Sequence, residues 1–574
     1  MNVILKTSDG NWLRFLKPKE ILVAYCLDEV IPILERAQSS DCYVAGYISY
    51  EASSAFDNAL ITYPSNGFPL VLFGLYESVE YLDSLPEFSL SGCCSDIRPS
   101  ISEEVYCDKI NKIKDHISKG YSYQINYTYS LLGSFSGDPY GLFYSLVQNQ
   151  DTDYASFIEY KEWAICSASP ELFFSLEDGV IRSIPMKGTI ARGRTLDEDV
   201  LLSKSLKNSE KNKSENIMIV DMIRNDLGRI AKTGSINVSD IFKLERYKTL
   251  WQMTSTVQGV YDGSILEIFR ALFPCASITG APKVKTMELI KELEDHPRGI
   301  YTGSIGYWTP KGTAQFNVAI RTALIDMNSS RITYGVGSGI VWDSDAKSEY
   351  IETLIKAEVL LGKNPDFDLL ETMAWLPEKG IVLKERHLER LSLSAKYFDI
   401  NYNRRQVIKL LDNLNDDTPL KIRILINKKG EVKIEKYPLT VFFEDDVIEL
   451  KLASKPIDKD DIWLYHKTTN RSVYANAESE IVDCDDVVLW NINGEVTEGT
   501  FLNIAIEENG QWITPPVNSG LLAGIMRQKL LDSGEIKERV ITLDDLKKTK
   551  KIRVFNSVRG ICDAVLKTSK IERE

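Results

Sequence analysis

The sequence predicts an α+β protein with two domains, and three observations support this prediction. The chain has 574 residues, which is too long for one ordinary domain. Strand-like runs alternate with amphipathic helical stretches, as in mixed structures whose helices pack on sheets. A helix-like run over 349–361 ends at Gly362, and Pro365 cannot continue it. We therefore expect a first domain over 1–362 and a second over 366–574.

The first domain is expected to be the larger one, with mostly antiparallel sheets. Short apolar runs predict strands, among others, at 42–50, 163–176 and 331–341. The smaller second domain is also expected to be α+β, with strands at 419–427, 486–492 and 500–508 and helices at 384–397 and 522–531.

The composition favours small-molecule chemistry. The formal net charge is −14 and basic residues are interspersed with acids, so nucleic-acid binding is not expected. No apolar run approaches the ~18 residues of a membrane span, and the N-terminal residues lack a signal pattern, so we expect no membrane association and a cytoplasmic protein. Nine scattered cysteines without a CxxC pair, and only four histidines, disfavour a disulfide framework, a zinc site and a Ser-His-Asp triad. Carboxylates and lysines must carry the chemistry.

Lys187 stands in the segment SIPMKGTIARG, after a strand-like run over 180–184. An amine at a strand end, beside a glycine that lets a ligand approach the backbone, suits a covalent nucleophile. A lone lysine beside Gly and Pro is otherwise typical of an exposed turn. The interpretation therefore depends on the neighbouring motifs.

Two helical segments place carboxylates where a hard cation would need them. Glu215 is expected to open a helix, because apolar residues recur after it at helical spacing. Glu349, Glu352 and Lys356 stand at i, i+3 and i+7, so all three project from one helix face. Carboxylate oxygens beside an anionic substrate fit Mg²⁺, although the same spacing also fits an ordinary solvated face.

A glycine-rich stretch precedes the second of these helices. Gly335, Gly337 and Gly339 surround Ser338 directly before it. We expect a turn here whose backbone amides hold a carboxylate at the helix N-terminus.

Together these segments resemble the chorismate-utilising enzymes over roughly residues 40–362. The motifs occur in the family's order: SASPELFF (167–174), IPMKGT (184–189), IVDMIRNDLGRI (219–230) on the Glu215 helix, SITGAPKVKTMELI (277–290), YTGSIGYW (301–308), FNVAIRT (316–322) and GVGSGIVWDSDAKSEYIET (335–353). Anthranilate synthases and isochorismate-type enzymes carry a small residue where this chain has Lys187. A lysine there is similar to the aminodeoxychorismate synthase component I group.

The resemblance implies a reaction and roles for particular residues. Lys187 would attack ring carbon 2 of chorismate, the carbon-4 hydroxyl would leave with Glu171 as general acid, and ammonia would displace the lysine at carbon 4. Glu215 and Glu352 would hold Mg²⁺, with Glu349 acting through water. The implied substrate-binding residues are Ser277, Tyr301, Arg321, Gly337, Ser338, Gly339 and Lys356. Gln252 departs from the pattern, because anthranilate synthases carry a histidine at about this position.

The source of ammonia is expected to be a second protein. A glutaminase needs a nucleophilic cysteine on a glycine-rich elbow, and none of the nine cysteines has that setting. A separate glutamine amidotransferase subunit is therefore implied.

The second domain has its own pair of reactive residues. Lys467 follows a strand-like segment, IWLYH, and Glu498 follows a glycine turn. A Schiff-base lysine and a carboxylate for a pyridinium nitrogen are the minimum for pyridoxal phosphate (PLP) chemistry. The spacing resembles the fold-type IV class of PLP enzymes over 366–574. The resemblance implies a phosphate site formed by Arg390, by the backbone amides of Gly524, Ile525 and Met526, and by Ser557, and it leaves a homodimer through this domain open.

The activity of the second domain has two candidates. A lyase acting on the first domain's product would eliminate pyruvate and give 4-aminobenzoate, the folate precursor. An aminotransferase is equally compatible with Lys467 and Glu498. Three further interpretations are an anthranilate- or salicylate-forming synthase fused to an aminotransferase, a non-catalytic chorismate-binding regulator, and a structural partner with a degenerate PLP fold. Lys187 disfavours the first, and the intact sets of reactive residues disfavour the other two.

Overall fold

The chain forms two compact units. The computed structural model describes residues 1–87, 90–150, 152–362, 365–443 and 445–567. Unit 1 comprises Met1–Arg192 and Ser203–Asn364, and unit 2 comprises Gly193–Leu202 and Pro365–Glu574. The chain thus passes from one unit to the other at 192/193, at 202/203 and at 364/365. The boundary expected between 362 and 366 includes Lys363 and Asn364, which lie outside the described residues.

Unit 1 is built on two large sheets, each with ten strands in the described part of the chain, and the pairs within them are antiparallel. The first sheet runs in the order β16 (Gly280–Ala281), β8 (Gln124–Gly137), β20 (Arg331–Ile340), β19 (Thr322–Asp326), β10 (Trp163–Ser167), β9 (Ser156–Tyr160), β1 (Asn2–Lys6), β2 (Trp12–Phe15) and β6 (Glu80–Leu82), with β7 (Gly92–Pro99) on β8. The second runs in the order β13 (Met186–Ala191), β15 (Leu250–Val260), β12 (Val180–Ile184), β11 (Leu172–Glu177), β18 (Ala314–Val318), β17 (Ser304–Trp308), β4 (Tyr43–Ile48), β5 (Val71–Tyr76) and β3 (Glu20–Ala24), with β14 (Asn237–Arg246) on β15.

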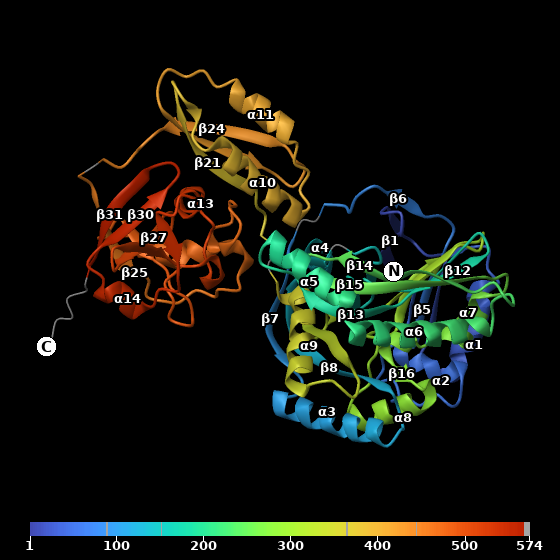
Figure 1. Cartoon of the computed structure of the whole chain (residues 1–574). Helices are drawn as coiled ribbons and strands as arrows, with labels where there is room; N and C mark the ends of the chain where they lie inside the picture. The colour runs from blue at the N-terminus through green and yellow to red at the C-terminus, as the bar shows by residue number, and fades with distance from the viewer. Residues whose placement is uncertain (88–89, 151, 363–364, 444, 568–574) are drawn as a thin grey trace. The chain divides into compact units, whose positions relative to one another are not determined.

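The two sheets pack on each other and carry helices on their other faces. Residues of the first sheet such as Val3 and Phe15 share one core with Tyr47 and Leu72 of the second. The first sheet is covered by α3 (Glu103–Ser118), α4 (Pro139–Gln150), α8 (Lys283–Leu293) and α9 (Ala346–Leu361). The second is covered by α1 (Leu27–Gln38), α6 (Glu210–Gly228) and α7 (Ile265–Leu272). Helix α6 lies along β13 and β15 (Figure 1). The predicted α+β class with a large antiparallel domain is confirmed.

Two local predictions in unit 1 are wrong. Glu215 does not open a helix, because α6 begins at Glu210 with Ser209 as its N-cap. The glycine-rich stretch is not a turn but part of β20, which pairs along its length with β8. Glycine is needed there for close approach: a Cβ on Gly335 would lie 2.1 Å from the Tyr301 ring, and one on Gly339 would lie 2.3 Å from the Lys187 Nζ.

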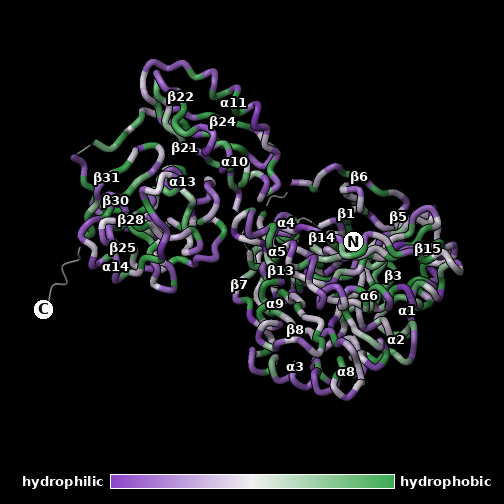
Figure 2. Tube along the Cα trace, viewed as in Figure 1, coloured by the Kyte–Doolittle hydropathy of each residue, from purple (hydrophilic) through white to green (hydrophobic). Residues whose placement is uncertain are grey.

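Unit 2 contains two smaller sheets, of four and seven strands among the described residues. The four-stranded sheet runs in the order β22 (Gly380–Ile381), β21 (Leu369–Leu376), β23 (Leu420–Ile426) and β24 (Val432–Pro438). Helices α10 (Lys384–Phe398) and α11 (Arg404–Asp412) share its core. Helix α11 buries Val407 and Leu411 while its charged residues face outward, so hydrophilic and hydrophobic residues alternate along its trace (Figure 2).

The seven-stranded sheet mixes parallel and antiparallel pairs. Its order is β26 (Asp486–Val488), β25 (Val447–Leu452), β31 (Gly560–Leu566), β30 (Ile552–Asn556), β27 (Asn503–Glu508), β28 (Gln511–Thr514) and β29 (Ile536–Glu538), and helices α13 (Ile525–Asp532) and α14 (Leu543–Lys548) accompany it. The strand expected before Lys467 is wrong. Residues Ile462–Leu464 form a 3₁₀ turn, because the Asp461 side chain accepts a hydrogen bond from the Trp463 amide at 3.0 Å.

Among the helices that the structure describes, none combines the length and apolar composition that crossing a membrane requires.

Candidate functional site

Unit 1 encloses a cavity of about 170 Å³ whose walls come from β13, β20, α6 and α9. The structure brings all the residues expected in the first site to this cavity: Glu171, Lys187, Glu215, Ser277, Tyr301, Arg321, Gly337, Ser338, Gly339, Glu349, Glu352 and Lys356. These residues come from segments far apart in the sequence, and the antiparallel pairing of both sheets places them on one cavity.

Lys187 lies inside β13 and not at a strand end. The pairing of β13 with β15 shifts register between Met186 and Thr189, so Lys187 and Gly188 occupy a bulge. Bulges re-aim side chains, which explains how this lysine faces the cavity. Gln252 fixes the bulge, because its Nε2 donates to the Gly188 carbonyl and its Oε1 accepts from the Thr189 hydroxyl, both at 3.1 Å. The position that departs from the family pattern thus supports the lysine strand.

Glu171 and Arg321 are both buried on the cavity wall. Burial raises the pKa of Glu171 to about 7, against the opposing effects of Ser277, Lys187 and Arg321. Burial likewise lowers the pKa of Arg321. Within the described residues, Glu171 Oε1 and Arg321 Nη1 have no hydrogen-bond partner. Buried polar atoms are rarely left unsatisfied, so both groups are placed to meet a ligand.

The three glutamates expected at the metal site each have a partner. Glu215 Oε2 lies 3.6 Å from the Lys187 Nζ, and Glu352 Oε1 lies 2.7 Å from the Lys356 Nζ. Glu349 accepts a hydrogen bond from the Ser338 hydroxyl. The described part of the chain holds no cluster of three acidic, His or Cys groups arranged around a metal position.

The carboxylates nevertheless fit Mg²⁺ by the chemistry of their donors. Burial opposes ionisation of Glu352, but Lys356 and then Lys187 and Lys211 hold the pKa of this carboxyl below its ordinary value. Glu352 is therefore an anionic oxygen donor, and Mg²⁺ usually takes only one or two carboxylates from a protein together with several waters. Glu215 and Glu352 would hold the ion.

Gln124 at the start of β8 is a buried residue beside Gly339 of the cavity wall, and the sequence reasoning did not single it out. Its side chain is fully buried, and neither amide atom has a partner among the described residues. A Cβ on Gly339 would lie 3.2 Å from the Gln124 Nε2 and 2.3 Å from the Lys187 Nζ. The amide therefore lies beside the same glycine as the Lys187 amine. No local signal marked it, because β8 mixes polar and apolar residues along its length.

The second expected site lies in unit 2, where Lys467 and Glu498 are electrostatic neighbours. Burial and then Arg390 lower the pKa of Lys467 to about 8. Burial raises the pKa of Glu498 to about 7, against hydrogen bonds from the Leu522 amide and the Tyr474 hydroxyl at 3.0 and 2.8 Å. A lysine that loses its proton near neutral pH suits Schiff-base chemistry.

Arg390 on α10 has the geometry of an anion site. Its Nε and Nη2 donate to the two oxygens of Glu371 at 2.7 and 2.9 Å, and its Nη1 donates to the Ala523 carbonyl at 3.1 Å. His387 Nδ1 also donates to Glu371, at 2.7 Å. Burial alone would raise the pKa of Glu371, but Arg390 and then His387 lower it to about 2. Three of the five guanidinium N–H groups are used, and two remain for a phosphate.

The phosphate loop follows Ala523. Gly524 is the N-cap of α13, and a Cβ there would lie 1.8 Å from the Asn503 Oδ1, so only glycine fits. Ile525 and Met526 form the first turn of that helix, whose free amides suit an anion. Ser557 lies in the turn between β30 and β31. Arg390 reaches the Ala523 carbonyl directly before this helix start, so Arg390 and the first amides of α13 suit the phosphate of PLP, while the part of Ser557 stays a prediction.

Models of known protein families match both parts of the chain. Residues 16–362 match the family model described as chorismate binding enzyme, and residues 368–565 match the one described as amino-transferase class IV. The chain is 39% identical over 279 residues to the chloroplastic aminodeoxychorismate synthase of Arabidopsis thaliana, which covers 48% of this chain and 30% of that protein. It is 38% identical to aminodeoxychorismate synthase component 1 of Bacillus subtilis, over 45% of this chain and 54% of the relative. It is also 32% identical to anthranilate synthase component 1 of Saccharolobus solfataricus, over 55% and 79%.

A solved structure shares the fold of unit 1. Anthranilate synthase component I from Streptococcus pneumoniae TIGR4 superposes with a TM-score of 0.54 at 22% identity, over 63% of this chain and 92% of that one. The matched part of this chain spans less than a third of the Arabidopsis protein and about half of the Bacillus one.

Proposed function

Since the chain belongs to the chorismate binding enzyme family, we propose that unit 1 is an aminodeoxychorismate synthase, which converts chorismate and ammonia to 4-amino-4-deoxychorismate and water. The observation that carries this proposal is a lysine, Lys187, facing the same cavity as a buried carboxyl, Glu171, whose pKa is raised to about 7. A nucleophile and a proton donor at neutral pH are what replacement of a ring hydroxyl needs.

The reaction uses these two groups in sequence. The Lys187 Nζ forms a bond to ring carbon 2, the ring double bonds shift, and the carbon-4 hydroxyl leaves as water with a proton from Glu171. Ammonia then bonds to carbon 4, the double bonds shift back, and the bond to Lys187 breaks. Because hydroxide is a poor leaving group, proton donation by Glu171 contributes ~10²–10⁴-fold. The Arg321 guanidinium, buried and with an unpaired Nη1 among the described atoms, orients a substrate carboxylate.

The part of the cavity lined by Glu215 and Glu352 binds the ring carboxylate of the substrate. Mg²⁺ held by Glu215 and Glu352 supplies charge neutralisation there when it is bound. The Lys356 Nζ donates to the Gly337 carbonyl at 3.0 Å, which holds α9 against β20. The glutamates on α9 are thereby kept at the cavity wall.

Ammonia is proposed to come from a separate glutamine amidotransferase. The aminodeoxychorismate synthase relatives of Bacillus subtilis and Escherichia coli are named component 1, and a first component implies a second. None of the nine cysteines lines the described cavity.

Unit 2 is proposed to be a lyase that converts 4-amino-4-deoxychorismate to 4-aminobenzoate and pyruvate. PLP supplies an electron sink when it is bound. Lys467, with a pKa of about 8, would take the proton from the ring carbon that loses hydrogen, and the departing enolpyruvyl group gains a proton to become pyruvate. Glu498 would hold the pyridinium nitrogen, and Arg390 would hold the phosphate. Formation of an aromatic ring makes the elimination favourable, and it removes the product of the first reaction.

An aminotransferase in unit 2 is the second candidate, because the matching family is described as amino-transferase class IV. Lys467, Glu498 and Arg390 serve either chemistry, since substrate choice lies elsewhere in the site.

One experiment tests both units. The pure protein is incubated with chorismate, ammonium and Mg²⁺, with and without PLP, and the products are identified. We expect 4-amino-4-deoxychorismate without PLP, and 4-aminobenzoate with equimolar pyruvate when PLP is added. Anthranilate or salicylate as the main product would overturn the assignment of unit 1. Transamination between an amino acid and a keto acid, without pyruvate release, would make unit 2 an aminotransferase.

A further inference from the structure

Ten residues that follow the Lys187 strand belong structurally to the other unit. The segment Gly193–Leu202 is part of unit 2, although the residues on both sides of it in the sequence belong to unit 1. The segment begins two residues after β13 ends at Ala191 and includes the start of α5 (Leu196–Asn208). Its contacts with the rest of unit 2 converge on Arg194 and on His466, the residue directly before Lys467.

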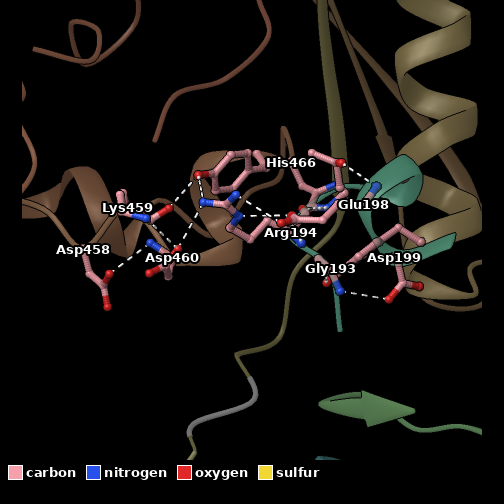
Figure 3. Close-up of polar contacts among 11 residues, drawn as sticks. Gly193, Arg194, Glu198, Asp199, Asp458, Lys459, Asp460 and His466 are labelled. Carbon is pink, nitrogen blue, oxygen red and sulfur yellow. Dashed lines mark hydrogen bonds and ion pairs between the residues drawn. The ribbon is translucent and has the colours of Figure 1, made fainter. Parts of the chain in front are cut away.

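Arg194 is the most highly connected side chain of this segment. Its Nε and Nη2 donate to Glu198 at 3.0 and 3.1 Å, and its Nη1 donates to Asp460 at 3.1 Å and to the Tyr465 hydroxyl at 3.2 Å. The guanidinium also lies over the Tyr465 ring, 5.2 Å from its centroid. Figure 3 shows Arg194 between Asp460 and Glu198. The planar guanidinium of Arg194 thus connects the 193–202 segment to Asp460 and Tyr465, which precede Lys467 in the sequence.

The local conformation of the segment is itself fixed. Gly193 N–H donates to Asp199 Oδ1 at 3.0 Å, and the Gly193 carbonyl accepts from the Tyr397 hydroxyl at 2.7 Å. A Cβ on Gly193 would lie 2.2 Å from the Asp199 amide nitrogen, so no other residue fits. Tyr397 is 3% exposed and lies on α10. The segment is thus held to unit 2 by specific hydrogen bonds, with Gly193 and Asp199 buried.

His466 connects the segment to the predicted cofactor site. Its Nε2 lies 3.0 Å from the Arg194 carbonyl oxygen, and its Nδ1 lies 3.0 Å from the Ser394 hydroxyl. A carbonyl only accepts, so Nε2 carries a hydrogen and donates to Arg194, while Nδ1 pairs with the Ser394 hydroxyl. The ring is 6% exposed and packs on Tyr397 at 4.3 Å between centroids. One imidazole therefore bridges the 193–202 segment and α10.

The helix on the other side of this bridge carries the phosphate arginine. Arg390 and Ser394 stand at i and i+4 on α10, so their side chains share a face. We infer that the 193–202 segment, through Arg194 and His466, positions Lys467 relative to Arg390, so that ten residues encoded within unit 1 complete the cofactor site of unit 2. Arg194 and His466 are positioning residues. This inference rests on the proposed function of unit 2 as a PLP enzyme.

The test measures cofactor binding in the full chain. We compare Arg194→Ala with wild type by equilibrium PLP binding and by the pH titration of the absorbance of the bound cofactor. We expect the dissociation constant to rise about tenfold, equivalent to about 1.4 kcal/mol, and the titration midpoint to shift. Arg194→Lys keeps the charge but loses the planar guanidinium, so we expect a dissociation constant between those of wild type and Arg194→Ala. This second variant keeps the test decisive if Arg194→Ala does not fold.

His466→Phe tests the bridge separately. Phenylalanine keeps the packing against Tyr397 but loses both hydrogen bonds, so the same loss of PLP affinity is expected. Arg194 holds the 193–202 segment through its side chain and His466 holds it through the Arg194 carbonyl, so both changes loosen the same segment and the double variant should lose less affinity than the two single losses combined. Arg404→Ala is the matched control. It also removes an arginine that pairs with two carboxylates, Glu385 and Glu389 on α10, but it does not touch the 193–202 segment.

The outcomes separate this inference from the function on which it rests. Loss of PLP affinity in Arg194→Ala and His466→Phe, with Arg404→Ala like wild type, supports the inference. Wild-type affinity and an unshifted titration in both variants would overturn it while the proposed function stands. Equal losses in all three variants would also overturn it, because they indicate general destabilisation. A wild-type protein that binds no PLP would overturn the function proposed for unit 2 itself.

Discussion

The two lysines proposed to react in this chain differ in their strongest charged neighbour. The Lys187 Nζ in unit 1 lies 3.6 Å from a carboxylate oxygen of Glu215. Lys467 in unit 2 has Arg390 as the charged group that acts on it most strongly, and burial together with Arg390 lowers its pKa to about 8. A carboxylate stabilises an ammonium group and a guanidinium destabilises it. Lys187 is therefore half of an ion pair in unit 1, whereas Lys467 in unit 2 loses its proton more readily than an ordinary lysine.

The difference shows that each unit prepares its lysine by a different route. The Lys187 Nζ has the Glu215 carboxylate as its charged neighbour. Glu215 is also an expected ligand of Mg²⁺, so the first site depends on what binds beside the lysine. The second site depends mainly on burial, which is present before any ligand arrives. The following changes test this contrast.

Lys187→Ala should have the largest effect. We expect synthesis of 4-amino-4-deoxychorismate to fall at least ~10³-fold, because no other amine is placed for the covalent step. A trace of anthranilate-type product is expected, since ammonia can then reach carbon 2. Both products are separated by chromatography after incubation with chorismate, ammonium and Mg²⁺. Undiminished synthesis of the 4-amino product would show that Lys187 is not the nucleophile, and the contrast between Lys187 and Lys467 would then not hold.

Lys467→Ala should reduce the activity of unit 2 and leave that of unit 1 unchanged. Pyruvate release should fall at least ~10²-fold, while chorismate consumption continues and 4-amino-4-deoxychorismate accumulates. Arginine is always charged and cannot substitute. Pyruvate and the amino intermediate are measured in the same samples. Formation of 4-aminobenzoate at the wild-type rate would show that the cofactor lysine is misassigned.

Glu215→Gln and Glu352→Gln should affect unit 1 only. Removing one ligand of a cation that bridges protein and substrate is expected to cost several kcal/mol, and turnover of chorismate at ordinary Mg²⁺ should drop ~10²-fold or more. PLP binding by the same variants is the internal control and should not change. Normal turnover in both variants would show that the cation lies elsewhere.

The smallest expected effect is a pH dependence in unit 2. Because only the neutral amine reacts, the rate of PLP incorporation into the cofactor-free protein should rise with pH through about 8, the pKa of Lys467, and then level off. The rate at pH 9 should exceed that at pH 7 by roughly tenfold. Stopped-flow absorbance measures this rate. A rate that still rises above pH 10 would indicate an ordinary, solvated lysine.

The sequence predicted the elements with clear periodicity well. The runs at 180–184 and 384–397 appear as β12 and α10, and the carboxylates of α9 share one face, as their spacing required. Spacing along a helix or strand is a local property, so one sequence suffices to find it. The residues expected in the first site also reach one cavity, although their roles stay predictions.

The errors arose where distant contacts decide the local structure. Glycines at 335–339 indicated a turn, but Tyr301 and Lys187 fill the space that side chains there would occupy. Asp461 converts an apolar, strand-like run into a 3₁₀ turn with a single hydrogen bond. The burial of Gln124, and the membership of 193–202 in unit 2, depend on pairings more than a hundred residues apart. No local pattern contains that information.

The three crossings between the units also limit how a gene of this kind can be divided. A break at the linker near residue 365 would leave residues 193–202 on the polypeptide that carries unit 1. The polypeptide for unit 2 would then lose the Gly193 and Arg194 carbonyls, which contact the Tyr397 hydroxyl and the His466 Nε2. Two separately inherited proteins would first have to replace that decapeptide with a local one. Because the chain crosses between the units three times, separating them requires more changes than keeping them fused.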